Sequence, residues 1–178
     1  MESISVQQPP RTIREVFEFL PEGTLAQLIE NQLVMSPTPT YNHQKVLQKI
    51  FFDIQNHLNN YEMGEILIAP FVVHLNDENI FQPDLIFIQK ENLSNIQQNG
   101  YHGAPDLVLE VLSPGTARYD RRKKKTAYER HGVFEYWLVD PDTKEAEGFF
   151  LKEGRYGDPV RSNGRIESEI LGNIFEFS

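Results

Sequence analysis

Two carboxylates stand in apolar runs, where acidic side chains are rare. Glu110 lies inside the run 106–112 (DLVLEVL), and Asp84 directly precedes the apolar letters LIFI. Alternation along a strand places Glu110 on the same face as Val108. An ionised carboxylate that leaves water needs a partner, or its pKa rises until it is neutral. Two carboxylates that point to the same side from neighbouring strands would form an oxygen site suited to Mg²⁺ or Mn²⁺.

Each acid also has an ordinary structural interpretation. Asp84 or Glu110 could pair with a buried Arg or Lys, or could lie at a strand end that water reaches. The residues that flank Glu110 are apolar on both faces of the strand, so 106–112 is expected to be a central strand covered on both sides. As a pair followed by a basic helix, the two acids favour a functional site over two isolated structural acids.

A basic segment follows the second acid. Residues 115–131 hold seven of the 17 Lys and Arg residues and two acids, although the whole chain carries a net charge of −9. Asp120, Lys124 and Tyr128 recur every fourth residue and therefore share one helix face. Two interpretations stay open. Asp120 and Lys124 could form a surface ion pair worth about 0.3–0.5 kcal/mol, or Lys124 could turn inward beside Glu110, where a cation orients water or offsets phosphate charge.

Basic side chains on the other faces of this segment would be available to a nucleic-acid backbone. The candidates are Arg118, Arg121, Arg122, Lys123 and Lys125. Nothing Gly-rich resembles a phosphate-cradling loop, so no nucleotide cofactor is expected. No pattern of Ser, His and Asp or of a Cys nucleophile stands out either.

The periodicity of the chain predicts an α+β or mixed α/β domain, with one sheet flanked by helices. The N-terminal half is expected to hold a short helix at 12–19, two short strands within 24–35 that turn at Glu30-Asn31, a helix at 41–59, and strand-like runs at 65–74 and 80–88 with a turn at 76–79. The C-terminal half is expected to hold a strand at 106–112, a helix at 117–130 ended by Gly132, a strand at 134–139, and then a hairpin and a final strand.

Length and composition narrow the class of protein. A chain of 178 residues fits one domain, here expected over 12–178 after a flexible arm at 1–11. The net charge of −9 argues against a general nucleic-acid coat protein. The absence of cysteine rules out disulfides and thiolate metal sites and suits a reducing cytoplasm. The sequence shows neither a signal peptide nor an apolar run of about 20 residues, so no membrane association is expected.

Two stretches, "QPDLIFI" and "GAPDLVLEVLSPGTARYDRRKKKTAYERHGVFEYWLVDP", resemble the Uma-type restriction endonuclease family, within the PD-(D/E)XK nuclease superfamily. The resemblance covers most of the chain, from about Leu28 to Pro141. It implies a restriction-endonuclease-like core of helix, three-stranded meander, helix and strand, with an extra N-terminal hairpin and C-terminal strands. It also implies metal-dependent cleavage of DNA phosphodiesters.

The resemblance assigns roles to particular residues. The first motif aspartate of the superfamily corresponds to Asp84, and the Glu of its E-x-K element to Glu110. The third position of that element is Leu112, so the lysine is placed on the following helix, where Lys124 matches it with Asp120 and Tyr128 beside it. Asp106 also matches the family, and a structural role at the start of the strand is the alternative for it.

The chain departs from the family pattern in its early hairpin. Members often carry a Gly-Glu pair where this chain has Asn31-Gln32. Superfamily enzymes commonly use a further acid near the first helix, and the candidates here are Gln32 and His43, neither of which is acidic. Glu65 could replace the missing acid. His43 is either a polar end of the apolar helix stripe or a contact to water or phosphate.

The leading hypothesis is a Mg²⁺- or Mn²⁺-dependent DNA endonuclease in which Asp84 and Glu110 bind the metal and Lys124 positions water or stabilises the phosphate. The main alternative is a nuclease-fold module that has lost turnover and binds nucleic acid or a protein. A phosphatase or other phosphoester hydrolase with the same site is a third interpretation. Double-strand cleavage with one site per chain would need two chains, so a homodimer is a geometric expectation.

Overall fold

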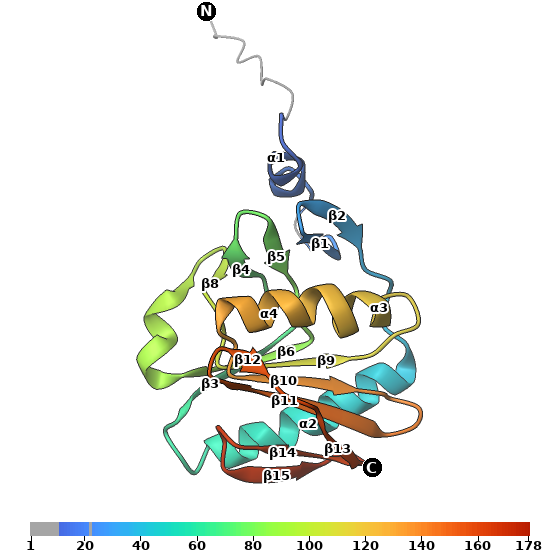
Figure 1. Cartoon of the computed structure of the whole chain (residues 1–178), viewed down its shortest axis with the longest axis vertical. Coiled ribbons are helices and arrows are strands. Elements are labelled where there is room, and N and C mark those ends of the chain that lie inside the picture. The colour runs from blue at the N-terminus through green and yellow to red at the C-terminus, as the bar shows by residue number, and fades with distance from the viewer. Residues whose placement is uncertain (1–10, 22) are drawn as a thin grey trace, which may run out of the picture.

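A central mixed sheet organises the molecule. The computed structural model describes residues 11–21 and 23–178, so the expected arm, apart from Arg11, lies outside the described residues. The sheet has the strand order β12-β11-β10-β9-β6-β3, with β13 paired to β11 (Figure 1). Its strands are β3 (Gly64–Ile68), β6 (Leu85–Gln89), β9 (Leu107–Val111), β10 (Glu135–Val139), β11 (Glu145–Lys152), β12 (Arg155–Tyr156) and β13 (Val160–Asn163).

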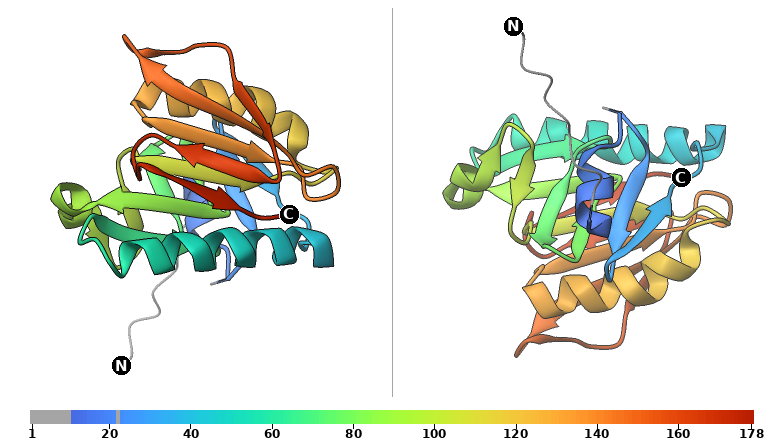
Figure 2. Two further views of the ribbon diagram at one scale, coloured as in Figure 1. Left: turned by 90° about the horizontal axis from the view of Figure 1, so that it is seen from below. Right: turned by 90° about the horizontal axis from the view of Figure 1, so that it is seen from above.

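Helices cover both faces of this sheet, as expected (Figures 1 and 2). Helix α2 (Tyr41–Leu58) begins at the N-cap Thr40 and packs on one face, where Leu107, Leu109 and Val111 of β9 meet it. The opposite face carries one continuous helical segment, made of α3 (Ala117–Tyr119), the π-helical η2 (Asp120–Lys124) and α4 (Lys125–His131). All five residues of β9 are buried, which confirms the prediction of a central covered strand.

Gly132 ends α4 in the left-handed conformation, with φ of 91°, as its position after the helix predicts. A short helix, α1 (Ile13–Glu18), precedes the first hairpin. Within the described part of the chain, no helix combines the length and apolar character that a membrane crossing requires.

The runs 65–74 and 80–88 are not single strands, which corrects the expectation. The first divides into β3 and β4 (Val73–Asn76) around Pro70, and the second into β5 (Asn79–Phe81) and β6 around Pro83. Proline has no backbone N–H and cannot donate to a strand ladder, so each run is interrupted. Asp84 therefore lies directly after a break, where the chain passes from one sheet to another.

The second sheet has the order β2-β1-β5-β4-β8-β7. Its remaining strands are β1 (Ala26–Ile29), β2 (Gln32–Met35), β7 (Ile96–Gln97) and β8 (Gly100–His102), and a short 3-10 helix, η1 (Lys90–Asn95), precedes β7. Strands β1 and β2 turn at Glu30 and Asn31, with φ of 50° and 57°, which confirms the predicted tight turn.

The C-terminal part is richer in strands than expected. Beyond β11 to β13, the hairpin of β14 (Arg165–Ser168) and β15 (Asn173–Glu176) packs on the α2 side of the main sheet. The sequence of β13 (VRSN) is largely polar and exposed, so it lacks the apolar alternation that reveals a strand.

A buried carboxylate holds this C-terminal hairpin. Glu135 of β10 is fully buried and accepts hydrogen bonds from the Ser168 hydroxyl (2.6 Å) and from the backbone N–H groups of Glu169 and Ile170. Burial raises its pKa from 4.5 to about 7, against the lowering effect of these hydrogen bonds.

Glu135 makes the stability of the fold depend on pH. The folded protein holds this proton more tightly than the unfolded chain, so the stabilisation is complete below about pH 4.5 and is lost as pH rises through about 7. We expect the wild type to lose about 3 kcal/mol from this group between pH 5 and 8, and Glu135→Gln to show a flatter profile. Urea unfolding at several pH values measures both. Identical pH profiles for the two proteins would contradict the assignment.

Candidate active site

The register of β6 and β9 brings Asp84 and Glu110 together. These strands are antiparallel, with Leu85 opposite Leu109, so one further step places Asp84 opposite Glu110. Asp84 is also tied to β9 directly, because its Oδ2 accepts a hydrogen bond from the Val111 N–H at 2.8 Å. The structure thus brings together the two acids that the sequence singled out, on neighbouring strands.

Lys124 reaches Glu110 from the helix above the sheet. Its Nζ lies 2.7 Å from Glu110 Oε1 and 3.1 Å from Asp120 Oδ1. The side chains of Lys124 and Asp120 are each only 2% exposed, so the interpretation of a surface ion pair is wrong and the inward one is correct. Tyr128 donates from its hydroxyl to the same Glu110 oxygen at 3.2 Å.

A π-helical turn shapes this part of the helix. The expected regular helix is instead widened at η2, whose two ends are Asp120 and Lys124. The hydroxyl of Tyr136, on β10, donates to the carbonyl oxygen of Asp120 at 3.0 Å. Such π-turns are rare and are frequent at functional sites. Here the turn keeps both of its charged end residues directed into the protein.

Carboxyl groups outnumber the buried ammonium in this cluster. Burial raises the pKa of Glu110 to about 8; Lys124 opposes the rise, and the nearby carboxylates of Asp120 and Asp84 add to it. Burial acts to lower the pKa of Lys124, but Asp120 and Glu110 raise it more, so the ammonium group stays charged. Glu110 is therefore protonated at neutral pH in the protein alone, and a divalent cation bound beside it would favour its ionised form.

His43 supports the other acid. It lies in the first turn of α2, is 5% exposed, and its Nε2 is 3.2 Å from Asp84 Oδ2. Burial acts to lower its pKa, but the hydrogen bond and charge of Asp84 outweigh burial and raise it. Its Nδ1 is buried and has no hydrogen-bond partner among the described residues. His43 is therefore a buried polar residue at the end of the apolar helix stripe, in contact with Asp84.

A small pocket of about 80 Å³ opens onto both acids. Beside the predicted Asp84, Glu110, Lys124 and His43, it is lined by residues that the sequence did not single out, among them Gln27, Ser36, Gln82, Ser113 and Thr116. Gln27 is 4% exposed, donates to Ser36 Oγ at 2.9 Å and accepts from the Gln82 N–H at 3.1 Å. These side chains are uncharged and come from separate segments; Gln82, Ser113 and Thr116 lie in the stretches that resemble the Uma-type family, but their residue types alone indicate no metal-binding or catalytic role.

The sequence pattern of the Uma2 family, described as "Putative restriction endonuclease", matches residues 14–175. The chain belongs to the Uma2 family. A crystal structure of "a putative nuclease belonging to DUF820" from Anabaena variabilis ATCC 29413 has the same fold, with a TM-score of 0.75, 15% sequence identity and 92% of each chain covered. A comparison with curated proteins found no match. The predicted family and the nuclease-like α+β fold are therefore confirmed.

Three residues that the sequence suggested for the site of this Uma2 protein lie away from Asp84 and Glu110. Gln32 is exposed, and its Oε1 accepts from Lys123 Nζ at 3.4 Å, so it is not a ligand beside Asp84. Glu65 is opposite Ile88 in β3, roughly 13 Å along the strand from Asp84. Asp106 accepts from the Gln89 N–H (2.8 Å) and from Asn92 Nδ2 (2.9 Å), which is a structural role at the start of β9.

The basic residues of the helical segment α3–η2–α4 divide into two groups, according to whether another described residue contacts their charged ends. Arg121 pairs with Glu147, Lys123 with Glu30 at 2.8 Å, and Lys125 lies 4.1 Å from the centre of the Phe149 ring. Arg118 and Arg122 are exposed and form no ion pair with any described residue. Of the five predicted nucleic-acid contacts, these two are therefore the most available to a phosphate backbone.

The two acids fit a hard divalent cation. No described residue donates a hydrogen bond to Asp84 Oδ1 or Glu110 Oε2, and both residues line the pocket. Within 11–21 and 23–178, no three His, Cys, Asp or Glu residues are grouped as a complete metal cage. Mg²⁺ commonly binds one or two carboxylates and keeps several waters or phosphate oxygens as its other ligands. The residues present match that pattern.

Proposed function

We propose that the protein is a Mg²⁺-dependent endonuclease that hydrolyses DNA phosphodiester bonds at the Asp84–Glu110 pair, with Mn²⁺ as an alternative ion. One observation carries the proposal: Glu110 faces Asp84 in a pocket while the buried Lys124 holds it at 2.7 Å. Both residues line the pocket, and each has one carboxyl oxygen that accepts no hydrogen bond from any described residue, so a cation could bind there.

The protein groups have separate tasks in this proposal. Asp84 and Glu110 would hold the metal through Oδ1 and Oε2, the oxygens that receive no hydrogen bond. When bound, Mg²⁺ would acidify a water molecule and neutralise phosphate charge. Lys124 and Tyr128 fix the orientation of Glu110, and His43 fixes Asp84. The Lys124 ammonium also adds positive charge where the phosphate becomes more negative during attack.

The first test is cleavage itself. We expect purified protein with millimolar Mg²⁺ to nick or cut supercoiled plasmid, and EDTA to abolish the reaction because the two carboxylates alone do not activate water. Gel electrophoresis separates nicked from linear product, and a linear product that grows steeply with protein concentration indicates two cooperating chains. Failure to cleave any DNA form with Mg²⁺ or Mn²⁺, together with no Mn²⁺ binding by electron paramagnetic resonance, would refute the proposal.

A second candidate function is DNA binding without turnover. It is favoured by the observation that neither Gln32 nor Glu65 supplies a third acid beside Asp84, and by the acidic charge of the whole chain. This candidate predicts salt-sensitive DNA binding that survives Glu110→Gln, with no cleavage by the wild type. Activity on a small phosphodiester such as bis-(p-nitrophenyl) phosphate, but not on DNA, would instead indicate a general phosphodiesterase.

A further inference from the structure

The outward face of α2 combines exposed aromatic rings with lysines. At 3.6 residues per turn, Tyr41, Lys45, Lys49 and Phe52 fall within about 80° on one side of the helix. Tyr41 is 76% exposed and Phe52 60%, while the opposite side of the helix is buried in the core. Large exposed rings on a helix contribute nothing to that core, so this face is available to a ligand.

Two of the nearby cations have no acidic partner. Lys49 pairs with Asp53 at 2.5 Å, but Lys45 forms no ion pair with any described residue. Lys144, in the turn between β10 and β11, donates to the carbonyl oxygen of Pro141 at 2.7 Å and forms no ion pair with any described residue. The charges of both ammonium groups are therefore available to an anionic ligand.

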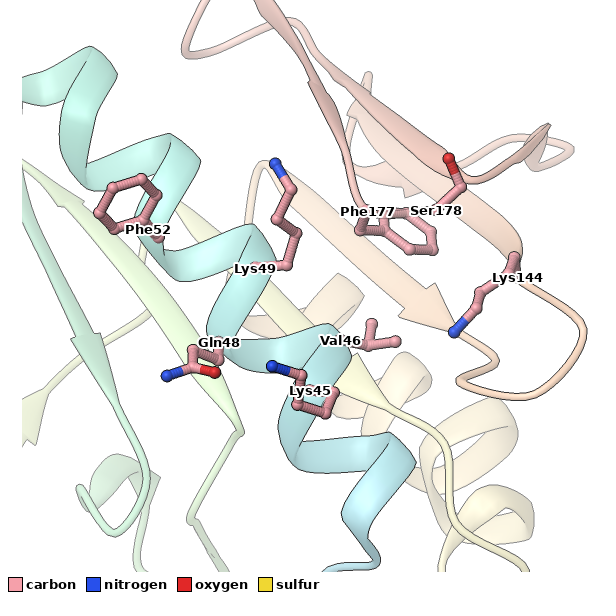
Figure 3. A pocket seen from close by; sticks show the side chains of 8 residues that line it. All are labelled: Lys45, Val46, Gln48, Lys49, Phe52, Lys144, Phe177 and Ser178. Carbon is pink, nitrogen blue, oxygen red and sulfur yellow. The ribbon is translucent and has the colours of Figure 1, made fainter.

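Lys45, Lys49, Phe52 and Lys144, but not Tyr41, line a groove of about 430 Å³ (Figure 3). Lys45, Lys49 and Phe52 form its α2 wall, while Lys144 and Phe177 stand on the other wall, and the Lys144 side chain extends toward the helix. Ligand pockets commonly enclose roughly 300–1,000 Å³, so the groove can admit a nucleotide with its phosphate near the lysines.

The N-terminal end of α2 lies beside the candidate active site. Tyr41 is the first residue of α2, and His43, two residues later and on the opposite, buried side of the helix, contacts Asp84. A strand that leaves the pocket around this end of the helix would pass Tyr41 and then reach the groove. Alternation of aromatic rings with cations is typical of surfaces that bind single strands, where unpaired bases stack on the rings and cations track the phosphates. Bases within a duplex are not available for such stacking.

We propose that this face of α2, together with Lys144, binds a single-stranded segment of the DNA, with bases stacked on Tyr41 and Phe52 and phosphates at Lys45 and Lys144. The inference rests on the proposed function, because it names the form of DNA that enters the site. It implies that the preferred substrate has an unpaired strand next to the cleaved bond, such as a flap, an overhang or a bubble.

Binding in EDTA tests the inference without cleavage. Fluorescence anisotropy compares a labelled oligothymidylate of about 20 nucleotides with a duplex of equal length. We expect tighter binding of the single strand, a roughly ten-fold loss for each of Tyr41→Ala and Phe52→Ala, and little change for the duplex. Lys45→Gln should reduce the salt slope for the single strand by about 0.7. Phe52→Trp should retain binding, because it keeps a stacking surface.

Matched controls come from the same chain. Phe19→Ala removes a ring that is 61% exposed directly after α1, and Lys152→Gln removes an exposed lysine away from the groove; neither should alter binding. The inference fails if the wild type binds neither DNA form, if it prefers the duplex, or if Phe52→Ala weakens neither form or both equally. Cleavage that is lost in Glu110→Gln would still support the proposed function in those cases. Conversely, single-strand binding that depends on the rings, combined with full activity of Glu110→Gln, would contradict the proposed nuclease site but support single-strand binding by this face of α2.

Discussion

Glu110→Gln is expected to lower DNA cleavage by roughly 100- to 1,000-fold or more while leaving the fold intact. The amide has nearly the shape of the carboxylate and can still accept hydrogen bonds from Lys124 and Tyr128, which contact Oε1 in the wild type. It removes the negative charge with which Glu110 would hold a divalent cation. Glu110→Ala is a poorer test, because it would take a buried partner from Lys124 and destabilise the protein by about 3–5 kcal/mol.

Glu135→Gln is a matched control for this experiment. Glu135 is also a buried glutamate in the central sheet, on the strand next to β9, but it bonds to Ser168 and does not line the pocket. Its variant should cleave DNA like the wild type at neutral pH. Circular dichroism and thermal melting verify the fold, and Mn²⁺ binding by electron paramagnetic resonance should be lost only in Glu110→Gln. Full activity of Glu110→Gln would place the metal elsewhere.

The central part of the site could be predicted because it depends on local periodicity. Alternation along β9 placed Glu110 on the face opposite Leu109, and repetition every fourth residue placed Asp120, Lys124 and Tyr128 together. The apolar neighbours of Glu110 then predicted that this side chain is buried. The π-turn could not be foreseen, yet both of its charged ends still point inward, so the prediction for Lys124 survived it.

The rest of the site depends on contacts between distant segments, which periodicity does not encode. Gln32 was a candidate for the further ligand that superfamily enzymes use, but the first hairpin belongs to a separate sheet, and Gln27, on its other strand, lines the pocket instead. Likewise, the acids that neutralise Arg121 and Lys123 are Glu147 and Glu30, both far away in the sequence. Pro70 and Pro83 were visible in the sequence, but apolar residues on either side made each interrupted run look continuous.

Lys124→Met is expected to destabilise the protein by about 3–5 kcal/mol at pH 8, since it leaves Glu110 and Asp120 buried without a cation. The loss should depend on pH. The pKa of Glu110 is about 8 even with Lys124 present, and removal of the ammonium raises it further. A raised carboxyl pKa gives stability that is present below about 4.5 and lost as pH rises through the folded-state value. Below about pH 8 Glu110 is protonated in both folded proteins, so its part of the Lys124→Met deficit should be absent at pH 5 and should appear only as pH rises toward and beyond 8.

Urea unfolding at pH 5, 8 and 9 measures this deficit, and a double variant identifies its source. In Glu110→Gln/Lys124→Met, the neutral amide no longer requires a cation, so part of the stability should return and the remaining deficit belongs to Asp120. Cleavage should be lost in Lys124→Met and in the double variant alike, because neither retains the ammonium beside the phosphate. A Lys124→Met protein as stable as the wild type at pH 8 would show that this lysine does not neutralise the buried acids. Stability that returns in the double variant without activity would separate the two tasks of Lys124, which are to neutralise Glu110 in the fold and to supply charge to the reaction.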